Sequence, residues 1–283
     1  MAATQNMPKI KFDPANIKLW GDVWLGTVGT IDKKTGKPKA KERKCFDKKQ
    51  GMDFGKIAID PIVAAALSKM LGDIPVVPPV NSDALLPPAG TLDCIEVGDT
   101  KVVGGVRAQN FDIAYRPDGI RIAYDSKTLN DAGSIKKNWN NMINDLSAEA
   151  TTVHTRFPYA LALFFIVIPK PALHPNQAAD LIRTLERMNE RESVLGENHK
   201  AESIALVVWD PITGEVDSTV PAQTSSLRLE KFSERIEKIY LSRYKGLPPH
   251  ERYDCYIFFG ICGSQAFEQP NRVFGYREKQ LLH

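Results

Sequence analysis

The feature that most constrains the fold is a run of nine consecutive apolar residues, 160–168 (ALALFFIVI). A strand of this composition buries both of its faces, so it belongs inside a sheet that is covered on both sides. Nine residues are also far fewer than the ~20 that cross a bilayer as a helix. The run therefore predicts a central strand of an α/β protein and argues against a membrane anchor.

Amphipathic segments and further apolar strands alternate around this run. A hairpin of two strands precedes it, and such an order is typical of a mixed β-sheet with helices on both faces. We expect the hairpin over 111–127, helices over 134–154, 175–191 and 226–243, and strands over 203–209 and 253–262.

The first ninety residues differ from this regular pattern. Residues 33–49 carry nine Lys/Arg against two acids, which fits either a solvated loop or a flexible arm that tracks phosphates. A short helix is expected over 60–71, capped by Asp60, and the five prolines of 74–90 predict an extended connector. We therefore expect residues 1–90 to be an elaboration for recognition or dimerisation, a subdomain at most, and residues 91–283 to be the core.

Composition narrows the function only slightly. The chain has 37 Lys+Arg and 34 Asp+Glu, and this formal charge of +3 leaves nucleic-acid binding open, since the distribution of charge matters more than its sum. Its four cysteines form no CxxC pair, which indicates reduced thiols in a cytoplasmic protein. The N-terminus lacks the apolar core of a signal peptide, and no glycine-rich loop predicts a nucleotide cofactor.

The chemistry is concentrated in residues 111–128 (FDIAYRPDGIRIAYDSKT). The segment 116–119 (RPDG) suits a type I turn between two alternating strands. Placing the apolar residues of both strands on one side predicts the cross-strand pairs, because the side-chain period of a strand is two. These pairs are Tyr115 with Ile120, Ile113 with Ile122 and Phe111 with Tyr124.

In this register Asp112 lies opposite Ala123, and Asp125 is one diagonal step away, within ~7–8 Å at the Cα level. Lys127 follows on the same face as Asp125, and the small residues Ala114 and Ala123 leave room for a ligand. Two carboxylates this close repel each other unless a hard divalent cation lies between them. Mg²⁺ at such a place acidifies a bound water and neutralises charge on a phosphate, and a nearby lysine stabilises the same charge.

Asp112, followed by Asp125-Ser126-Lys127 on the next strand and then by a helix and an apolar strand, resembles the PD-(D/E)xK nuclease superfamily. Type II restriction endonucleases of this size look closest, and the resemblance covers residues 105–170. It implies Asp112 and Asp125 as metal ligands with the Ser126 carbonyl as a third, Lys127 as the catalytic lysine, and Mg²⁺ as the cofactor. Many members add an acidic residue from an upstream helix, for which Glu96 is a weak candidate.

The [DE]xK string alone has little value, since it occurs five times in the chain, but only the copy at Asp125 has an apolar strand before it and a helix behind it. A surface salt bridge on a solvated sheet face is the alternative interpretation. Polar residues on both sides of the motif and in the basic segment are candidate contacts to DNA phosphates or bases, with a solvated surface as the alternative. They are Arg107, Gln109, Asn110, Lys136, Lys137, Asn138, Asn141, Lys39, Lys41 and Arg43.

The resemblance favours a site-specific deoxyribonuclease of the type II restriction class, which would cut double-stranded DNA as a homodimer. A nuclease of defence, repair or recombination that reads DNA structure or ends is a second hypothesis. A non-catalytic nucleic-acid-binding module, in which the acidic pair is only structural, is a third.

Overall fold

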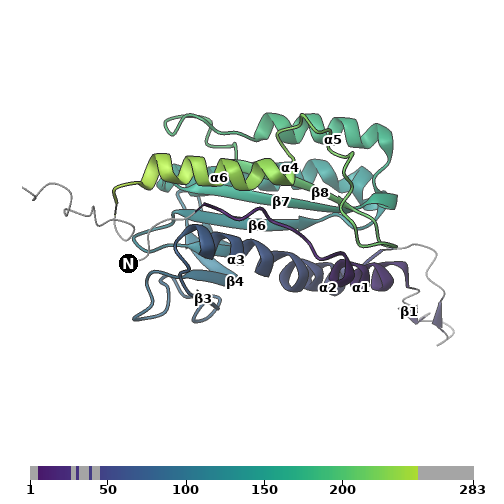
Figure 1. Cartoon of the computed structure of the whole chain (residues 1–283), viewed down its shortest axis with the longest axis horizontal. Helices are drawn as coiled ribbons and strands as arrows, with labels where there is room; N and C mark the ends of the chain where they lie inside the picture. The colour runs from purple at the N-terminus through teal and green to yellow at the C-terminus, as the bar shows by residue number, and fades with distance from the viewer. Residues whose placement is uncertain (1–5, 27–29, 32–37, 40–44, 248–283) are drawn as a thin grey trace, which may run out of the picture. The chain divides into compact units, whose positions relative to one another are not determined.

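The computed structural model describes residues 6–26, 30–31, 38–39 and 45–247, which all belong to one compact unit formed by residues 1–251. Its centre is a six-stranded mixed sheet in the order β3-β4-β5-β6-β7-β8 (Figure 1). The chain is therefore an α/β protein, as the sequence pattern predicted. The strand expected over 253–262 lies outside the described residues.

The sheet combines an antiparallel half with a parallel half. β4, β5 and β6 form an antiparallel meander, whereas β6, β7 and β8 run parallel, and the short β3 pairs parallel with β4. Every residue of β7 is buried, which explains its unbroken apolar sequence. The strands are β3 (Val76–Val77), β4 (Ile95–Val103), β5 (Ala108–Tyr115), β6 (Ile122–Thr128), β7 (Leu161–Pro169) and β8 (Ser203–Trp209).

Helices follow β6, β7 and β8 as expected, with shifted ends. The first of them begins two residues before Ser134, so the predicted cap at Ser134 is wrong. The helices are α4 (Ala132–Arg156), α5 (Pro175–Met188) and α6 (Leu229–Tyr244), and α1 (Pro14–Leu25) lies near the N-terminus. Shorter elements are β1 (Thr30–Ile31), β2 (Pro38–Lys39) and the 3₁₀ turn η2 (Lys170–Ala172).

The helix expected over 60–71 is the last part of a longer helical segment. It consists of α2 (Lys48–Asp53), the π-helix η1 (Phe54–Ile59) and α3 (Asp60–Met70). Asp47 caps this segment and forms a capping box with Gln50, so the prediction that Asp60 is the cap is wrong. Asp60 is buried inside the segment instead. The next residue, Pro61, has no N–H for the α-helical ladder, and the wider turns of η1 lie directly before it.

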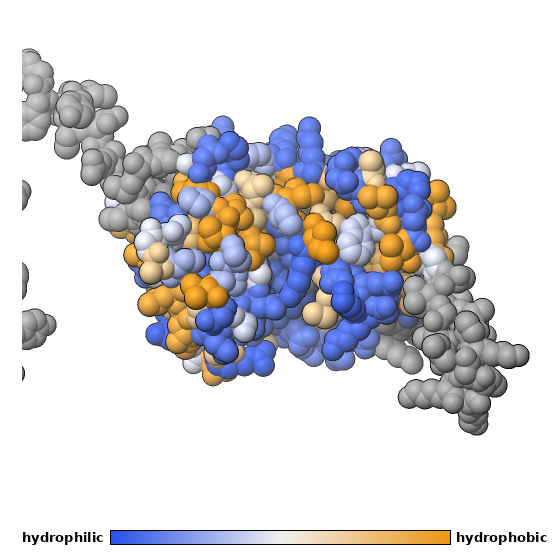
Figure 2. All heavy atoms as spheres, turned by 90° about the horizontal axis from the view of Figure 1, so that it is seen from below, coloured by the Kyte–Doolittle hydropathy of each residue, from blue (hydrophilic) through white to orange (hydrophobic). Residues whose placement is uncertain are grey.

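Helices cover both faces of the sheet (Figure 1). On one face, Phe165 of β7 contacts Phe232 of α6 with ring centroids 4.6 Å apart, and Trp209 of β8 lies 5.2 Å from Phe54 of η1. On the other face, α4 packs against β5 and β7. None of the helices in the described residues is long and apolar enough to span a membrane. Seen from the side of α1–α3, the surface mixes apolar patches with hydrophilic side chains (Figure 2).

Candidate functional site

The β5–β6 hairpin has a register that differs by two residues from the predicted one. Ile113 pairs with Tyr124 and Tyr115 with Ile122, because the connecting loop spans 116–121 and closes with Arg121 N–H donating to the Tyr115 carbonyl (2.8 Å). The predicted pairing of Tyr115 with Ile120 is therefore wrong. A shift of two residues keeps Ile113, Tyr115, Ile122 and Tyr124 on one common face, as predicted. The next residues along the two strands, Asp112 and Asp125, consequently face each other directly. Phe111 instead packs with Ala114 and Ala123 on the face of α4, so its predicted place beside Tyr124 is wrong.

Backbone pairing between β5 and β6 ends at Ile113 and Tyr124. Beyond this point the Asp112 side chain of β5 bonds to β6 in place of the backbone. The Asp112 Oδ2 atom accepts hydrogen bonds from the Ser126 backbone N–H (2.9 Å) and from the Ser126 hydroxyl (3.1 Å). The N–H and C=O of one strand residue point to the same side. The Ser126 carbonyl therefore also points towards the gap between β5 and β6, where the Asp112 carboxylate lies.

Lys127 is held between two carboxylates. Its ammonium bonds Asp125 on β6 and Glu149 on α4, the latter at 2.9 Å. The side chains of Asp125 and Glu149 are only 12% and 6% exposed, so this arrangement is not the solvated surface salt bridge of the alternative interpretation. Sequence analysis missed Glu149. Its signal was an acid at helical spacing from Leu146 and Val153, on the apolar face of α4.

A third carboxylate, Asp60, reaches the site from the start of α3. Its Oδ1 atom is buried and has no hydrogen-bond partner among the described residues, and the same is true of the nearby Tyr124 hydroxyl. Glu96, the weak candidate for an upstream acid, is instead paired with Arg116, which donates from Nε (2.5 Å) and Nη2 (2.8 Å). The available signal for Asp60 was a single acid within the apolar stretch 57–67.

Burial and mutual repulsion act together on these carboxylates. Burial, together with the neighbouring Asp125, raises the pKa of Asp112 to about 8, and burial with the charge of Asp112 raises the pKa of Asp60 to about 8. Burial raises the pKa of Asp125 to about 6, against the opposing effect of Lys127. Burial by itself lowers the pKa of Lys127, but the carboxylates of Asp125 and Glu149 have the larger effect and raise this pKa above its usual value. The raised pKa values mean that these carboxyl groups resist being ionised together unless a further cation joins Lys127.

A cavity of about 190 Å³ opens beside the paired aspartates. Gly55 forms part of its wall, and a Cβ atom there would lie 3.0 Å from the Ser126 hydroxyl oxygen. The absence of a side chain at Gly55 therefore lets η1 approach β6 closely. The lining residues are Gly51, Met52, Gly55, Lys56, Asp99, Asp112, Asp125, Ser126 and Thr128.

The oxygen donors of this site fit a Mg²⁺ ion that keeps several of its bound waters. No three His, Cys, Asp or Glu side chains in the described part of the chain form a preformed metal cluster. Mg²⁺ is commonly held by one or two carboxylates plus water and substrate phosphate, and such a site needs no third acidic ligand. Asp112, Asp125 and the Ser126 carbonyl have such oxygens, and the buried Asp60 Oδ1 atom near them has no hydrogen-bond partner among the described residues.

Comparison with known proteins adds no assignment. No protein-family model, curated protein or solved structure matches the chain. The functional assignment therefore depends on the geometry of the site.

The space beside Ala114 and Ala123 is filled by protein. Both residues are fully buried and pack in one cluster with Val153 of α4, so the prediction that they leave room for a ligand is wrong. Their small size lets α4 lie close to the sheet. Glu149 lies one helical turn before Val153, and this approach brings it to Lys127.

The predicted DNA contacts are distributed around the site. Arg107, Gln109 and Asn110 lie at the start of β5 and do not line the cavity, and Arg107 donates to Gln109 (3.2 Å). Asn138 lines a neighbouring cavity of about 390 Å³ that shares Gly51, Met52 and Thr128 with the first, whereas Asn141 is exposed on α4 and lines neither. Lys41 and Arg43 lie outside the described residues, and for Lys39, Lys136 and Lys137 only the backbone is described.

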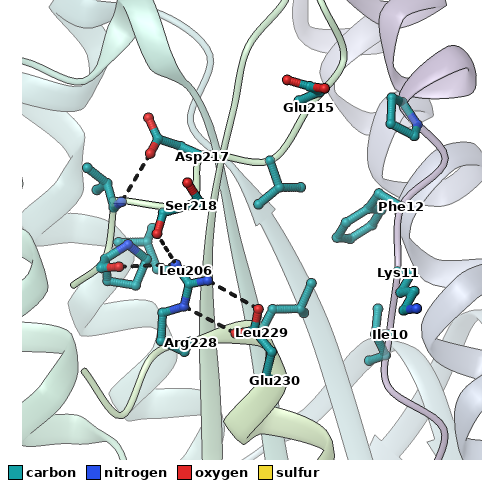
Figure 3. A pocket seen from close by; sticks show the side chains of 14 residues that line it. Ile10, Lys11, Phe12, Leu206, Glu215, Asp217, Ser218, Arg228, Leu229 and Glu230 are labelled. Carbon is teal, nitrogen blue, oxygen red and sulfur yellow. Dashed lines mark hydrogen bonds and ion pairs between the residues drawn. The ribbon is translucent and has the colours of Figure 1, made fainter. Parts of the chain in front are cut away.

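A larger cavity, of about 500 Å³, lies elsewhere, between the N-terminal segment and the region after β8 (Figure 3). Its buried charges are already satisfied. Arg228 binds both Glu230 oxygens at 3.1 Å and donates to the Ser218 carbonyl, and Asp217 binds Lys170 at 2.8 Å. The least exposed charged side chains of this cavity, Arg228 and Asp217, are thus paired, and we therefore take Asp112 and Asp125 as the candidate functional site.

Proposed function

We propose that this protein is a Mg²⁺-dependent nuclease that hydrolyses DNA phosphodiester bonds. The observation that carries the proposal is the direct opposition of Asp112 and Asp125 at the point where β5 and β6 separate, with Lys127 bonded to Asp125. Two buried carboxylates in this position are favourable when they share a divalent cation. The order of these residues on a mixed sheet also agrees with a restriction-endonuclease-like fold.

Each residue has a distinct part in the proposed reaction. Asp112, Asp125 and the Ser126 carbonyl would hold the cation, which would supply an acidified water and neutralise charge on the phosphate. Lys127 has three N–H donors, of which two are used by Asp125 and Glu149. The third can hold the attacking water beside Asp125. Glu149 keeps this ammonium in place.

We further propose a type II site-specific endonuclease that cuts double-stranded DNA as a homodimer in the cytoplasm. A nuclease that cuts double-stranded DNA needs restraint from its DNA recognition, because an unspecific activity would damage the DNA of its cell. A structure- or end-directed nuclease would use the same catalytic groups, so the pattern of cleavage distinguishes the two.

The test is cleavage of plasmid DNA with Mg²⁺ by wild type, Asp112→Asn and Asp125→Asn. We expect discrete fragments from wild type and at least about a hundredfold slower cleavage by either variant, on the scale of losing one preorganised electrostatic group. The matched control is Asp118→Asn on the same hairpin. Asp118 binds Arg121 at the turn (2.8 Å), away from the cavity, so its replacement should leave cleavage intact once melting curves show a folded protein.

Other outcomes decide between the hypotheses. A smear in place of discrete fragments retains the chemistry and favours the structure- or end-directed nuclease. DNA binding without cleavage of any DNA or RNA substrate supports the non-catalytic module. If Asp125→Asn cuts as well as wild type, the assignment of this site is wrong.

A further inference from the structure

The cavity beside Asp112 and Asp125 has one basic residue in its wall. Of the nine described residues that line it, three are aspartates and Lys56 alone is basic. Lys127 is not among them, because its ammonium is turned to Asp125 and Glu149. Among the residues that line the cavity, a phosphate would therefore meet carboxylates, the cation that we propose they hold, and Lys56.

Lys56 forms an ion pair with Asp99, and both residues line the cavity. Its Nζ atom on η1 lies 2.9 Å and 3.0 Å from the two carboxylate oxygens of Asp99 on β4. The two side chains are 37% and 53% exposed. Exposed ion pairs contribute little to stability, so Lys56 can leave Asp99 at small cost.

The backbone that carries Lys56 is unusual as well. Lys56 lies in the π-helix, a form that is rare and is frequently found at functional sites. The preceding residue, Gly55, brings this turn against Ser126. Lys56 thus follows directly on the residue that packs against Ser126, one of the proposed metal ligands.

We propose that Lys56 binds a phosphate of the DNA strand in this cavity, with a non-bridging phosphate oxygen replacing Asp99 as its partner. The inference rests on the proposed function and names the residue that recognises its substrate. Charge-assisted hydrogen bonds to phosphate are stronger than neutral ones, and they gain further in a cavity that excludes part of the water. Asp99 then competes with the phosphate for Lys56 and binds this lysine when DNA is absent.

The experiment measures binding separately from cleavage. A short fluorescein-labelled DNA duplex is titrated with full-length wild type, Lys56→Ala, Lys56→Arg, Asp99→Asn and the double variant, with Ca²⁺ in place of Mg²⁺ and the DNA checked afterwards for intactness. Anisotropy at several salt concentrations yields Kd and its salt dependence. The matched control is Lys69→Ala, which removes another exposed lysine–aspartate pair, with Asp73, near the other end of α3.

We expect Lys56→Ala to raise Kd about tenfold and to reduce the slope of log K against log salt by about 0.9, the value for one lost phosphate contact. Lys56→Arg retains most of the affinity. Asp99→Asn binds severalfold more tightly than wild type, and the double variant binds like Lys56→Ala. Lys69→Ala leaves both Kd and the slope unchanged.

Two results would overturn the assignment of Lys56. One is a Lys56→Ala variant with wild-type Kd and salt slope, and the other is an Asp99→Asn variant that weakens binding as much as Lys56→Ala. In either case wild type still binds and cuts DNA, so the proposed function survives. A wild type that neither binds nor cuts DNA overturns the proposed function and, with it, the role of Lys56.

Discussion

At the scale of single residues, the site depends on how Lys127 is held. Its ammonium has carboxylates on two sides, Asp125 on its own strand and Glu149 on α4. The second Glu149 oxygen is buried and has no partner among the described residues. An uncompensated buried oxygen has a cost in stability, which indicates that Glu149 is present for its effect on Lys127.

We therefore predict that Glu149→Ala lowers kcat by about 10- to 100-fold, the usual effect of removing a group that orients a catalytic residue. KM should stay close to wild type, because Glu149 does not line the cavity. Glu149→Gln should recover part of the rate, since its amide oxygen still accepts from Lys127. Steady-state cleavage kinetics measure both constants. The control is Asp145→Ala on the exposed face of α4, and equal loss in this control would contradict the prediction.

At the scale of elements, the position of η1 against β6 depends on Gly55. A methyl group at this position would lie 3.0 Å from the Ser126 hydroxyl, closer than most real contacts of this kind. Because Ser126 also donates to Asp112, a displacement there moves a proposed metal ligand.

We predict that Gly55→Ala reduces cleavage by about tenfold or more, given the sensitivity of catalysis to small misplacements of reacting groups. Its unfolding free energy should change by at most about 1 kcal/mol, because alanine is the better helix former and offsets part of the clash. Cleavage assays and urea denaturation separate the two effects. Gly196→Ala, where the nearest neighbouring atom would lie 3.9 Å away, is the control and should leave cleavage unchanged.

A second interaction between elements joins α4, β7 and α6 through the buried Glu202. Its carboxylate bonds His154 (3.0 Å), Arg191 (3.0 Å), Arg243 (2.8 Å) and the Ala162 N–H (2.8 Å). Burial opposes the charge of Glu202, but His154 and Arg243 outweigh it and lower its pKa below the usual 4.5. Glu202 is therefore the carboxylate that the buried side chains of His154, Arg191 and Arg243 share.

We predict that Glu202→Gln destabilises the protein by about 3–5 kcal/mol at neutral pH, because the buried arginines lose their counter-charge. A lowered pKa in the folded state means that the contribution of Glu202 is present above about pH 4.5 and is lost as the pH falls through the folded pKa. The difference between wild type and variant should therefore shrink below pH 4.5. Urea denaturation at a series of pH values measures it, and a difference that grows in acid would refute the assignment.

At the scale of the whole molecule, the unbalanced carboxylates should link metal binding to stability. A ligand that binds only the folded state stabilises it by about 2.7 kcal/mol at a hundredfold excess over Kd. For a protein of this size, each kcal/mol corresponds to about 2–4 °C in Tm.

We predict that saturating Mg²⁺ raises Tm by several degrees and that Asp112→Asn abolishes most of this shift. Without metal, Asp112→Asn should melt above wild type, because the repulsion with Asp125 is removed while an amide oxygen still accepts from Ser126. Thermal melting with Mg²⁺ and with a chelator measures both effects. An equal Mg²⁺ shift in wild type and variant would place the metal elsewhere.

Local periodicity was sufficient for much of the fold and for part of the site. The apolar run of β7 predicted a covered sheet, and the alternation in β6 placed Asp125 and Lys127 on one face. Asp112 was predicted on this face as well, but its carboxylate bonds the hydroxyl of Ser126, a residue of the opposite face of β6, at the point where β5 and β6 separate.

The tertiary structure alone decided which distant groups complete the site. Asp60 and Lys56 arrive on a helical segment that precedes the sheet, and Glu149 arrives on the helix that follows β6. No local period relates these residues to the strands. Their positions result from the packing of whole helices against the two faces, made close by Gly55 on one side and by Ala114 and Ala123 on the other. The sequence by itself determined the strand residues of the site, and helix packing determined its charge balance.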